Sequence, residues 1–454
     1  MSPTEFGPDV LAGILAARVA DYPRARLALA LSGGGDSAAL AAAAAALKGT
    51  SPGLGLRALH VHHGITAASD QLAEAALSAA RARGIPCTVL TVSLPAIPPQ
   101  GVEAAAREER YRALAAALTP GEYLLTAHQR EDQAETLLLQ LLRGAGIAGL
   151  SAMPEVAPLG PGWHLRPLLS VSRASLRAYA ESEGIAWHED PMNTDPRYDR
   201  VYLRQVVWPL IAARWPGAAH TLARASGHFQ SAQRLLEERG LEDARAVARG
   251  AGLDAHGLAT LAPERAGNAL RAYIAHQGLP MPPAARLQAI LKSLSARPDR
   301  HPCVIWPGAE VHRHEGTLYA FAPLPSWPGG EFPLSSDHPA DLGELGVIAL
   351  VAAGAEELRI APDYQSLVVR PRQGGERLRL NPGAPRRALK DWLRESGLPP
   401  WTRERLPFVW SGDKLVAVVT PAGAWLDVDC RAGPGAPGHQ LSWRGYPASL
   451  AFAR

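Results

Sequence analysis

Residues 27–37 read Leu-Ala-Leu-Ala-Leu-Ser-Gly-Gly-Gly-Asp-Ser, a short apolar run followed by a glycine-rich loop. The run predicts a buried strand, and the Ala/Leu-rich stretch at about 37–48 predicts a helix directly after the loop. Glycines let a backbone approach a phosphate closely, and a helix that begins there directs its amide groups and its dipole at the anion. The string therefore predicts a phosphate-binding loop, although glycine turns between a strand and a helix are common without a ligand.

The alternation of strands and helices continues to about residue 143. Strands are expected at 56–62, 87–93 and 122–127, and helices at 70–83, 101–118 and 130–143. Such alternation is typical of a parallel sheet with helices on both faces, in which ligands bind beyond the carboxyl ends of the strands. Because His60–Gly64 and Thr126–His128 also follow strands, we expect both segments to meet the glycine loop at one rim of the sheet.

The pattern changes twice further along the chain. Residues 216–295 look helical, a Pro/Gly/Ser-rich linker covers 323–340, and the last segment has short strands and one helix. Those last elements are expected at 347–352, 366–371 and 415–419 for the strands and 386–396 for the helix. We therefore predict a doubly wound α/β domain, a mainly helical middle domain and a small α+β domain, at 1–215, 216–325 and 326–454.

Composition narrows the class of protein. The 454 residues are 47% hydrophobic and 20% charged, which indicates a packed protein, and a net charge of +3 is too small to prove a polyanionic partner. Cys87, Cys303 and Cys430 lie far apart without a CxxC pair, which argues against a zinc site or an iron–sulfur cluster. We expect no secretion signal, because the N-terminal residues lack a basic region followed by an apolar core, and the apolar run at 38–47 is too short to span a bilayer. A cytoplasmic protein with no membrane partner is expected.

Three groups of residues suggest chemistry. The loop would hold phosphates, with hydroxyl donors from its serines and with Asp36 as a Mg²⁺ ligand; its residues are Ser32, Gly33, Gly34, Gly35, Asp36 and Ser37. Glu103, Arg107 and Arg110 share a helical face, which is also the pattern of an ordinary helix-stabilising pair. His128, Asp132 and Glu135 share another, where the two acids could hold an ammonium group or simply complement the helix dipole.

The Ser-Gly-Gly-Gly-Asp-Ser string resembles the pyrophosphate-loop ATPases, which cleave ATP between its first two phosphates and form adenylates. Together with residues 101–111, 126–143 and 166–210, it resembles the tRNA(Ile)-lysidine synthase family over the N-terminal half. Residues 369–393 resemble that family's last domain. The chain departs from the family at four positions. Gln129 stands where a second His is usual, and Thr66 stands where an Arg is usual. Met192 replaces a Ser or Thr, and Val201 replaces an Asn.

The resemblance implies an ATP-dependent ligase that joins free L-lysine to carbon 2 of the wobble cytidine of an isoleucine tRNA with a CAU anticodon. The reaction passes through an adenylated cytidine, releases AMP and pyrophosphate, and changes the codon read from AUG to AUA. It implies catalytic roles for Asp36, Arg107, Arg110 and His128, and lysine binding by Asp132 and Glu135. It also allows a homodimer.

The resemblance further implies tRNA contacts near the active site and in the last domain. These residues are Arg200, Arg204, Arg370, Arg372, Arg377, Arg379, Arg386, Arg387 and Lys390. A run of basic residues is more often a solvated face, but the high density of basic residues here suits electrostatic binding to RNA phosphates. Two alternatives stay open. A tRNA thiolase uses the same loop but normally needs cysteines to carry sulfur, and a nucleotide-sensing module would need neither the acid pair nor the basic segment.

Overall fold

The computed structural model describes residues 6–64, 68–93, 102–185, 187, 197–295, 301–352, 358–364, 366–433 and 436–451. The chain divides into two compact units, Met1–Leu235 and Leu236–Arg454, and each is described here by itself. The predicted domain boundaries near 215 and 325 stay predictions. Within the described ranges, no helix has the length and apolar character needed to cross a membrane.

The first unit is built on a six-stranded sheet in the order β3-β2-β1-β4-β6-β5. Its strands are β1 (Arg26–Ala30), β2 (Gly55–His62), β3 (Cys87–Thr91), β4 (Tyr123–Leu125), β5 (Val156–Leu159) and β6 (Gly162–Leu165). All neighbours pair in parallel except β5 and β6. The strands expected near 27–31, 56–62, 87–93 and 122–127 are therefore confirmed, and the edge pair β5–β6 is additional.

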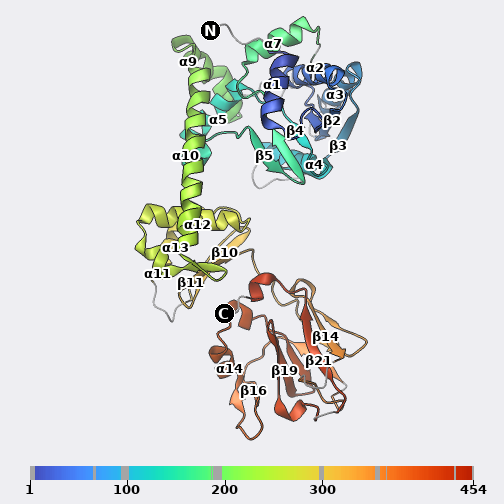
Figure 1. The fold of residues 1–454 in the computed structure, drawn as a ribbon, viewed down its shortest axis with the longest axis vertical. Helices are drawn as coiled ribbons and strands as arrows, with labels where there is room; N and C mark the ends of the chain where they lie inside the picture. The colour runs from blue at the N-terminus through green and yellow to red at the C-terminus, as the bar shows by residue number, and fades with distance from the viewer. Residues whose placement is uncertain are drawn as a thin grey trace. The chain divides into compact units, whose positions relative to one another are not determined.

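Helices cover both faces of this sheet (Figure 1). Along β1, Leu27 and Leu29 pack against one apolar cluster with α1, α2, α3 and α7, whereas Ala28 packs against a second cluster with α4. This alternation follows from the two-residue period of a strand. The helices of the unit are α1 (Pro8–Arg18), α2 (Gly35–Thr50), α3 (Ala68–Ala82), α4 (Val102–Ala117), α5 (Arg130–Leu142), α6 (Ile147–Leu150), α7 (Arg173–Ser182), α8 (Asp199–Tyr202), the π-helical turn η2 (Leu203–Val207) and α9 (Trp208–Arg214). The predicted doubly wound α/β fold is confirmed.

The second unit begins within the long helix α10 (Ala218–Ala246). The helical character expected for 216–295 is confirmed by α10, α11 (Ala255–Thr260), α12 (Pro263–His276) and α13 (Ala284–Ser293). A five-stranded antiparallel sheet, which the sequence pattern did not reveal, packs one face on these helices. Its strands are β7 (Ala248–Arg249), β8 (Gly252–Asp254), β9 (Cys303–Trp306), β10 (Ala309–His314) and β11 (Thr317–Phe321).

The remaining part of the second unit is α+β, as expected. The predicted strands near 347–352, 366–371 and 415–419 are present, and the predicted helix at 386–396 is α14 (Leu389–Glu395). The other elements are β12 (Phe332–Leu334), β13 (Ala340–Asp341), β14 (Val347–Ala352), β15 (Leu367–Arg370), β16 (Arg377–Leu378), β17 (Arg387–Ala388), α15 (Pro400–Arg403), β18 (Phe408–Ser411), β19 (Lys414–Thr420), β20 (Gly423–Leu426), β21 (His439–Arg444) and the 3-10 turns η3 (Gly343–Leu345), η4 (Val428–Cys430) and η5 (Ala448–Ala451). The core of this part surrounds the fully buried Phe408.

Candidate active site

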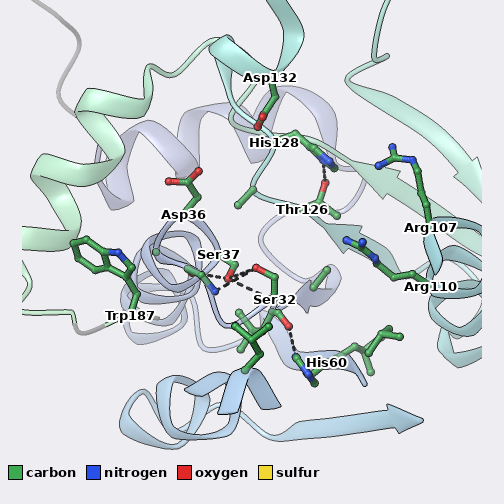
Figure 2. Close-up of a pocket in the computed structure, with 18 of the residues that line it drawn as sticks. Ser32, Asp36, Ser37, His60, Arg107, Arg110, Thr126, His128, Asp132 and Trp187 are labelled. Carbon is green, nitrogen blue, oxygen red and sulfur yellow. Dashed lines mark hydrogen bonds between the residues drawn. The ribbon is translucent and has the colours of Figure 1, made fainter. Parts of the chain in front are cut away.

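A cavity of about 700 Å³ opens at the carboxyl ends of β1, β2 and β4 (Figure 2). The glycine loop, the segment after β2 and the segment after β4 all line it, so the predicted convergence on one rim of the sheet is confirmed. The predicted residues that line the cavity are Ser32, Gly34, Gly35, Asp36, Ser37, Arg107, Arg110, His128, Asp132, Arg200 and Arg204. Its walls also include side chains to which the sequence reasoning gave no role, among them Arg173 and Tyr111.

The loop has the geometry that its glycines predict. Gly33 has φ = +87°, and a Cβ added there would lie 2.7 Å from the Leu72 carbonyl oxygen, so only glycine fits. Ser37 donates a hydrogen bond to the Gly34 carbonyl (2.8 Å), and the Ser32 and Ser37 hydroxyls lie 3.2 Å apart. Both serines therefore hold the shape of the loop. Gly34 and Asp36, at the start of α2, line the cavity where an anion would meet the helix dipole.

Asp36 presents a carboxylate to the cavity from the first turn of α2. Burial raises the pKa of Asp36; the Arg173 guanidinium opposes that shift, and the Asp132 carboxylate adds to it. A divalent cation would offset both the burial and the repulsion between the two carboxylates, and oxygen is the ligand atom that Mg²⁺ prefers. The chemistry of Asp36 thus fits a Mg²⁺ ion that accompanies a nucleotide.

Arg107 and Arg110 reach into the cavity from α4, on the opposite side from Trp187 (Figure 2). The Trp187 ring packs on the loop so closely that a Cβ on Gly35 would lie 3.0 Å from it. The Arg107 guanidinium lies over the Tyr111 ring, 5.1 Å from its centroid. The third member of this predicted face, Glu103, belongs to a segment whose side chains lie outside the described part of the structure.

At the cavity wall, the hydroxyl of Thr126 joins His128, which also lines the cavity, to His164. Thr126 Oγ1 lies 2.8 Å from His128 Nδ1 and 2.9 Å from His164 Nε2, and His164 is buried. Burial, reinforced by the positive charge of Arg166, lowers the pKa of both His128 and His164 to about 3. Both rings are therefore neutral at pH 7. His164 was missed because it enters the site only through the β4–β6 pairing, which no local motif signals.

The acid pair on α5 lies inside a cluster of arginines. Arg204 donates to Glu135 Oε1 and Oε2 (2.8 and 2.7 Å) and to Asp132 Oδ1 (3.0 Å). Arg200 donates to the same two acids at 3.1 Å each, and Arg173 lies 3.5 Å from Glu135. The Glu135 side chain is only 1% exposed and is absent from the cavity wall formed by the described residues, whereas Asp132 is part of that wall. The predicted anticodon-side arginines thus contact the predicted lysine-binding acids.

Gln129, where the family often has a second histidine, caps α5. Its Oε1 accepts a hydrogen bond from the Glu131 backbone N–H (2.8 Å), and Asp132 Oδ2 accepts one from the Gln129 N–H (3.1 Å). This capping box leaves Asp132 Oδ1 for other partners. Of the other departures, Val201 lies in α8, and Thr66 and Met192 lie outside the described residues.

Most basic residues of the C-terminal run have acidic neighbours. The pairs are Arg370 with Glu331 (2.8 Å), Arg372 with Glu376 (3.6 Å), Arg386 with Asp427 (3.1 Å) and Asp429 (2.8 Å), Arg387 with Glu395 (3.1 Å), and Arg379 with Asp429. Arg377 and Lys390 are exposed. The sequence predicted a dense basic cluster, and the fold brings carboxylates from as far away in the chain as Asp429 into it. Glu376 and Asp427 are buried, whereas Arg387 and Glu395 are both exposed. An exposed pair is weak, so the Arg387 guanidinium can exchange its partner.

The loop, the parallel sheet and the cavity define the class of protein, a pyrophosphate-loop ATP-binding protein. The family model described as "PP-loop domain" matches residues 11–211, "TilS substrate binding domain" matches 253–319, and "TilS substrate C-terminal domain" matches 367–443. The chain is 40% identical over 426 residues to the tRNA(Ile)-lysidine synthase of Alkalilimnicola ehrlichii, covering 92% of this chain and 94% of that protein. It is 39% identical over 407 residues to that of Pseudomonas aeruginosa, covering 86% of each chain. The chain belongs to the tRNA(Ile)-lysidine synthase family.

Proposed function

We propose that the protein is an ATP-dependent ligase that joins L-lysine to carbon 2 of the wobble cytidine of a CAU-anticodon isoleucine tRNA. The observation that carries this proposal is that one cavity, in a member of this family, is lined by both the phosphate loop and a mixed cluster of charges. The mixed cluster consists of Asp132 with Arg173, Arg200 and Arg204. An adenylated base and an amino acid must meet in such a space. ATP and tRNA are cytoplasmic, and we infer that the enzyme acts there.

The first step adenylates the oxygen on carbon 2 of the cytosine ring and releases pyrophosphate. The loop amides and the start of α2 hold the phosphates, and Asp36 would hold Mg²⁺, which would neutralise part of their charge. Arg107 and Arg110 stabilise the negative charge that develops on the phosphates. The target base leaves its stack to reach the cavity, at the energetic cost of unstacking.

In the second step, the lysine ε-amine attacks carbon 2, and AMP leaves. The mixed cluster suits a free amino acid because Asp132 can accept its α-ammonium group while Arg200 or Arg173 binds its α-carboxylate. Glu135, enclosed by guanidinium groups, holds these arginines in place. The ε-amine loses a proton as it forms the new bond, and the neutral His128 ring at the cavity wall can accept that proton. Burial is the main cause of the low pKa of His128, and its arginine neighbours lower it further. Phosphates bound nearby would offset the part that the arginines contribute.

The tRNA partner would contact Arg200 and Arg204 beside the cavity and the exposed basic residues of the last segment. Phosphate contacts fix the position of a nucleic acid without reading its sequence. Exposed Arg372, Arg377 and Lys390 have the right chemistry for such contacts. The expected homodimer stays a prediction, and sedimentation of the full-length protein would test it.

The test is incorporation of labelled lysine into unmodified isoleucine tRNA by the full-length protein, with and without ATP. Asp36→Ala should reduce the rate at least about a hundredfold, because it removes a charge that acts on the transferring phosphates. Filter binding of tRNA should stay near the wild-type affinity. The exposed Asp413→Ala is the matched control and should change neither measurement. Lysine incorporation by Asp36→Ala near the wild-type rate would disprove the assignment of the loop.

A further inference from the structure

The unpredicted sheet of the second unit gathers a thiol, an imidazole and a carboxylate on one face. Cys303 on β9 lies directly opposite His312 on β10, and Glu310 lies two residues before His312 on the same strand. Paired residues, and residues two apart on a strand, point to the same side of a sheet. The hairpin register thus brings together three side chains that can ligate metals.

The distances match the spacing of ligands around one ion. Cys303 Sγ lies 3.4 Å from His312 Nε2, which lies 3.4 Å from Glu310 Oε2, and all three ligand atoms lie within 4.8 Å of one another. Usual zinc bond lengths and tetrahedral angles separate neighbouring S, N and O ligand atoms by about 3.3–3.6 Å. Only small side-chain movements would be needed to coordinate an ion.

The surroundings hold two of the ligands in place. Glu310 Oε1 accepts a hydrogen bond from the Leu324 N–H at 3.3 Å, which leaves Oε2 directed to the site. The His312 ring stacks on Phe321 with an interplanar angle of 12° and contacts Trp401 at 4.7 Å between ring centroids. Contacts outside the coordination sphere commonly orient metal ligands in this way. Glu310 is itself buried, so its carboxylate would gain from a cation that replaces lost hydration.

We propose that Cys303, Glu310 and His312 form a zinc-binding site that fastens the β9–β10 hairpin, with water in the fourth coordination position. Mixed thiolate, imidazole and carboxylate ligands suit Zn²⁺ better than Mg²⁺ or Ca²⁺. Cys303 is the exposed member and leaves one side of the site open to solvent. The absence of a CxxC pair argued against zinc, but ligands nine residues apart can meet through strand pairing.

Binding of the ion exchanges a proton for a metal–sulfur bond. Only the thiolate form of a cysteine binds the metal, so each ion that Cys303 binds as a thiol should release one proton to the buffer. The same thiolate gives cobalt(II), a common substitute for zinc, a near-ultraviolet charge-transfer absorption.

The experiment is titration of metal-free, full-length protein with Co²⁺, followed by displacement with Zn²⁺. The expected result is one equivalent of tetrahedral cobalt with a thiolate charge-transfer band, which zinc abolishes. Cys303→Ser should lose the band, and Glu310→Gln and His312→Asn should each weaken binding at least about tenfold. Cys87→Ser, at the half-buried cysteine of the first unit, is the matched control and should keep the full band.

A second measurement guards against misfolded variants. Zinc should slow alkylation of Cys303 in the wild-type protein and leave alkylation of Cys87 unchanged, as followed by mass spectrometry of peptides. Wild-type protein without a stoichiometric cobalt band would overturn the proposal, as would a band that persists in Cys303→Ser. Neither result depends on lysidine formation.

Discussion

Two clusters of arginines and carboxylates in this protein use the same residue types in opposite ways. At α5, the Glu135 side chain is 1% exposed and has Arg173, Arg200 and Arg204 around it. In the C-terminal run, Arg387 and its partner Glu395 are 39% and 51% exposed. The C-terminal run is a dense charged stretch in the sequence, whereas the arginines around Glu135 lie 38 to 69 residues away from it, so local charge density does not reveal which carboxylates are enclosed.

The difference lies in solvation. A carboxylate enclosed by protein has given up its water, so each guanidinium that remains has a large effect on the free energy of folding. An exposed pair competes with water and salt, and its arginine can move to a phosphate at little cost. We therefore expect mutations in the α5 cluster to act on stability and on the amino-acid substrate. Mutation of Arg387, whose partner is exposed, should act on RNA binding instead.

The largest expected effect is on stability, from Arg204→Ala. It removes three hydrogen bonds to the two acids and leaves Glu135 short of positive charge. Breaking a buried pair costs about 3–5 kcal/mol, and we expect about 3 kcal/mol because Arg173 and Arg200 stay in place. Urea unfolding followed by circular dichroism would measure the loss as a lower urea concentration at the midpoint of the unfolding transition.

The double variant Arg204→Met/Glu135→Met is the control for this loss. It keeps the bulk of both side chains and removes both charges, so it should recover much of the stability. If Arg204→Ala unfolds at the wild-type urea concentration, the ion pairs of Glu135 with its guanidinium partners do not stabilise the fold. The proposed difference in stability between the two clusters would then be wrong.

Asp132→Asn should act on lysine rather than on stability. Asparagine keeps the oxygen that caps α5 but loses the charge that lines the cavity. A charge-assisted hydrogen bond contributes about 1.5–3 kcal/mol, so the Michaelis constant for lysine should rise about tenfold to a hundredfold. Steady-state kinetics should show a change in the constant for ATP of less than about threefold. A parallel rise in both constants would instead make Asp132 part of the nucleotide or metal site.

The elements around this site were predictable because their signals are local. An apolar run of strand length, a glycine loop and an Ala-rich helix follow one another without interruption, and β1 and α2 lie within two residues of their expected limits. The sequence also predicted that the segments after β1, β2 and β4 meet at one cavity, because parallel strands place their carboxyl ends at the same edge of the sheet. The loop, Arg107, Arg110, His128 and Asp132 were found in this way.

The features that were missed depend on pairing between distant residues. The strands β9 to β11 are only four to six residues long, and β10 carries Glu, His and Arg among its apolar residues, so no long apolar run marks this sheet. His164 reaches Thr126 only through strand pairing. The enclosure of Glu135 by arginines of α7, α8 and η2 is likewise invisible, because helical spacing shows which residues share a face and not what covers it.

The triple variant Arg372→Ala/Arg377→Ala/Lys390→Ala tests the C-terminal run directly. The three side chains are exposed, and Glu376, the buried partner of Arg372, keeps its hydrogen bonds from the Gln373 and Gly374 N–H groups, so melting temperature should change little. The affinity for tRNA should fall about tenfold at moderate salt. Each lost phosphate contact should lower the slope of log affinity against log salt by about 0.7–0.9, and the three together by about 2–3. ATP affinity should stay unchanged. An unaltered slope would mean that the run is a solvated face and that Arg200 and Arg204 carry tRNA binding alone.

The smallest expected effect is that of Arg387→Ala on stability, and it is the counterpart of Arg204→Ala. Arg387 also pairs with a glutamate, Glu395, and its guanidinium lies over the Trp392 ring at 4.5 Å. Since both charges are exposed, water replaces the lost partner, and we expect no resolvable shift in the urea unfolding curve. The same variant should weaken tRNA binding more at low salt than at high salt, if the guanidinium exchanges Glu395 for phosphate. A stability loss as large as that of Arg204→Ala would show that exposure does not separate the two clusters, and that the C-terminal arginines are structural rather than available to RNA.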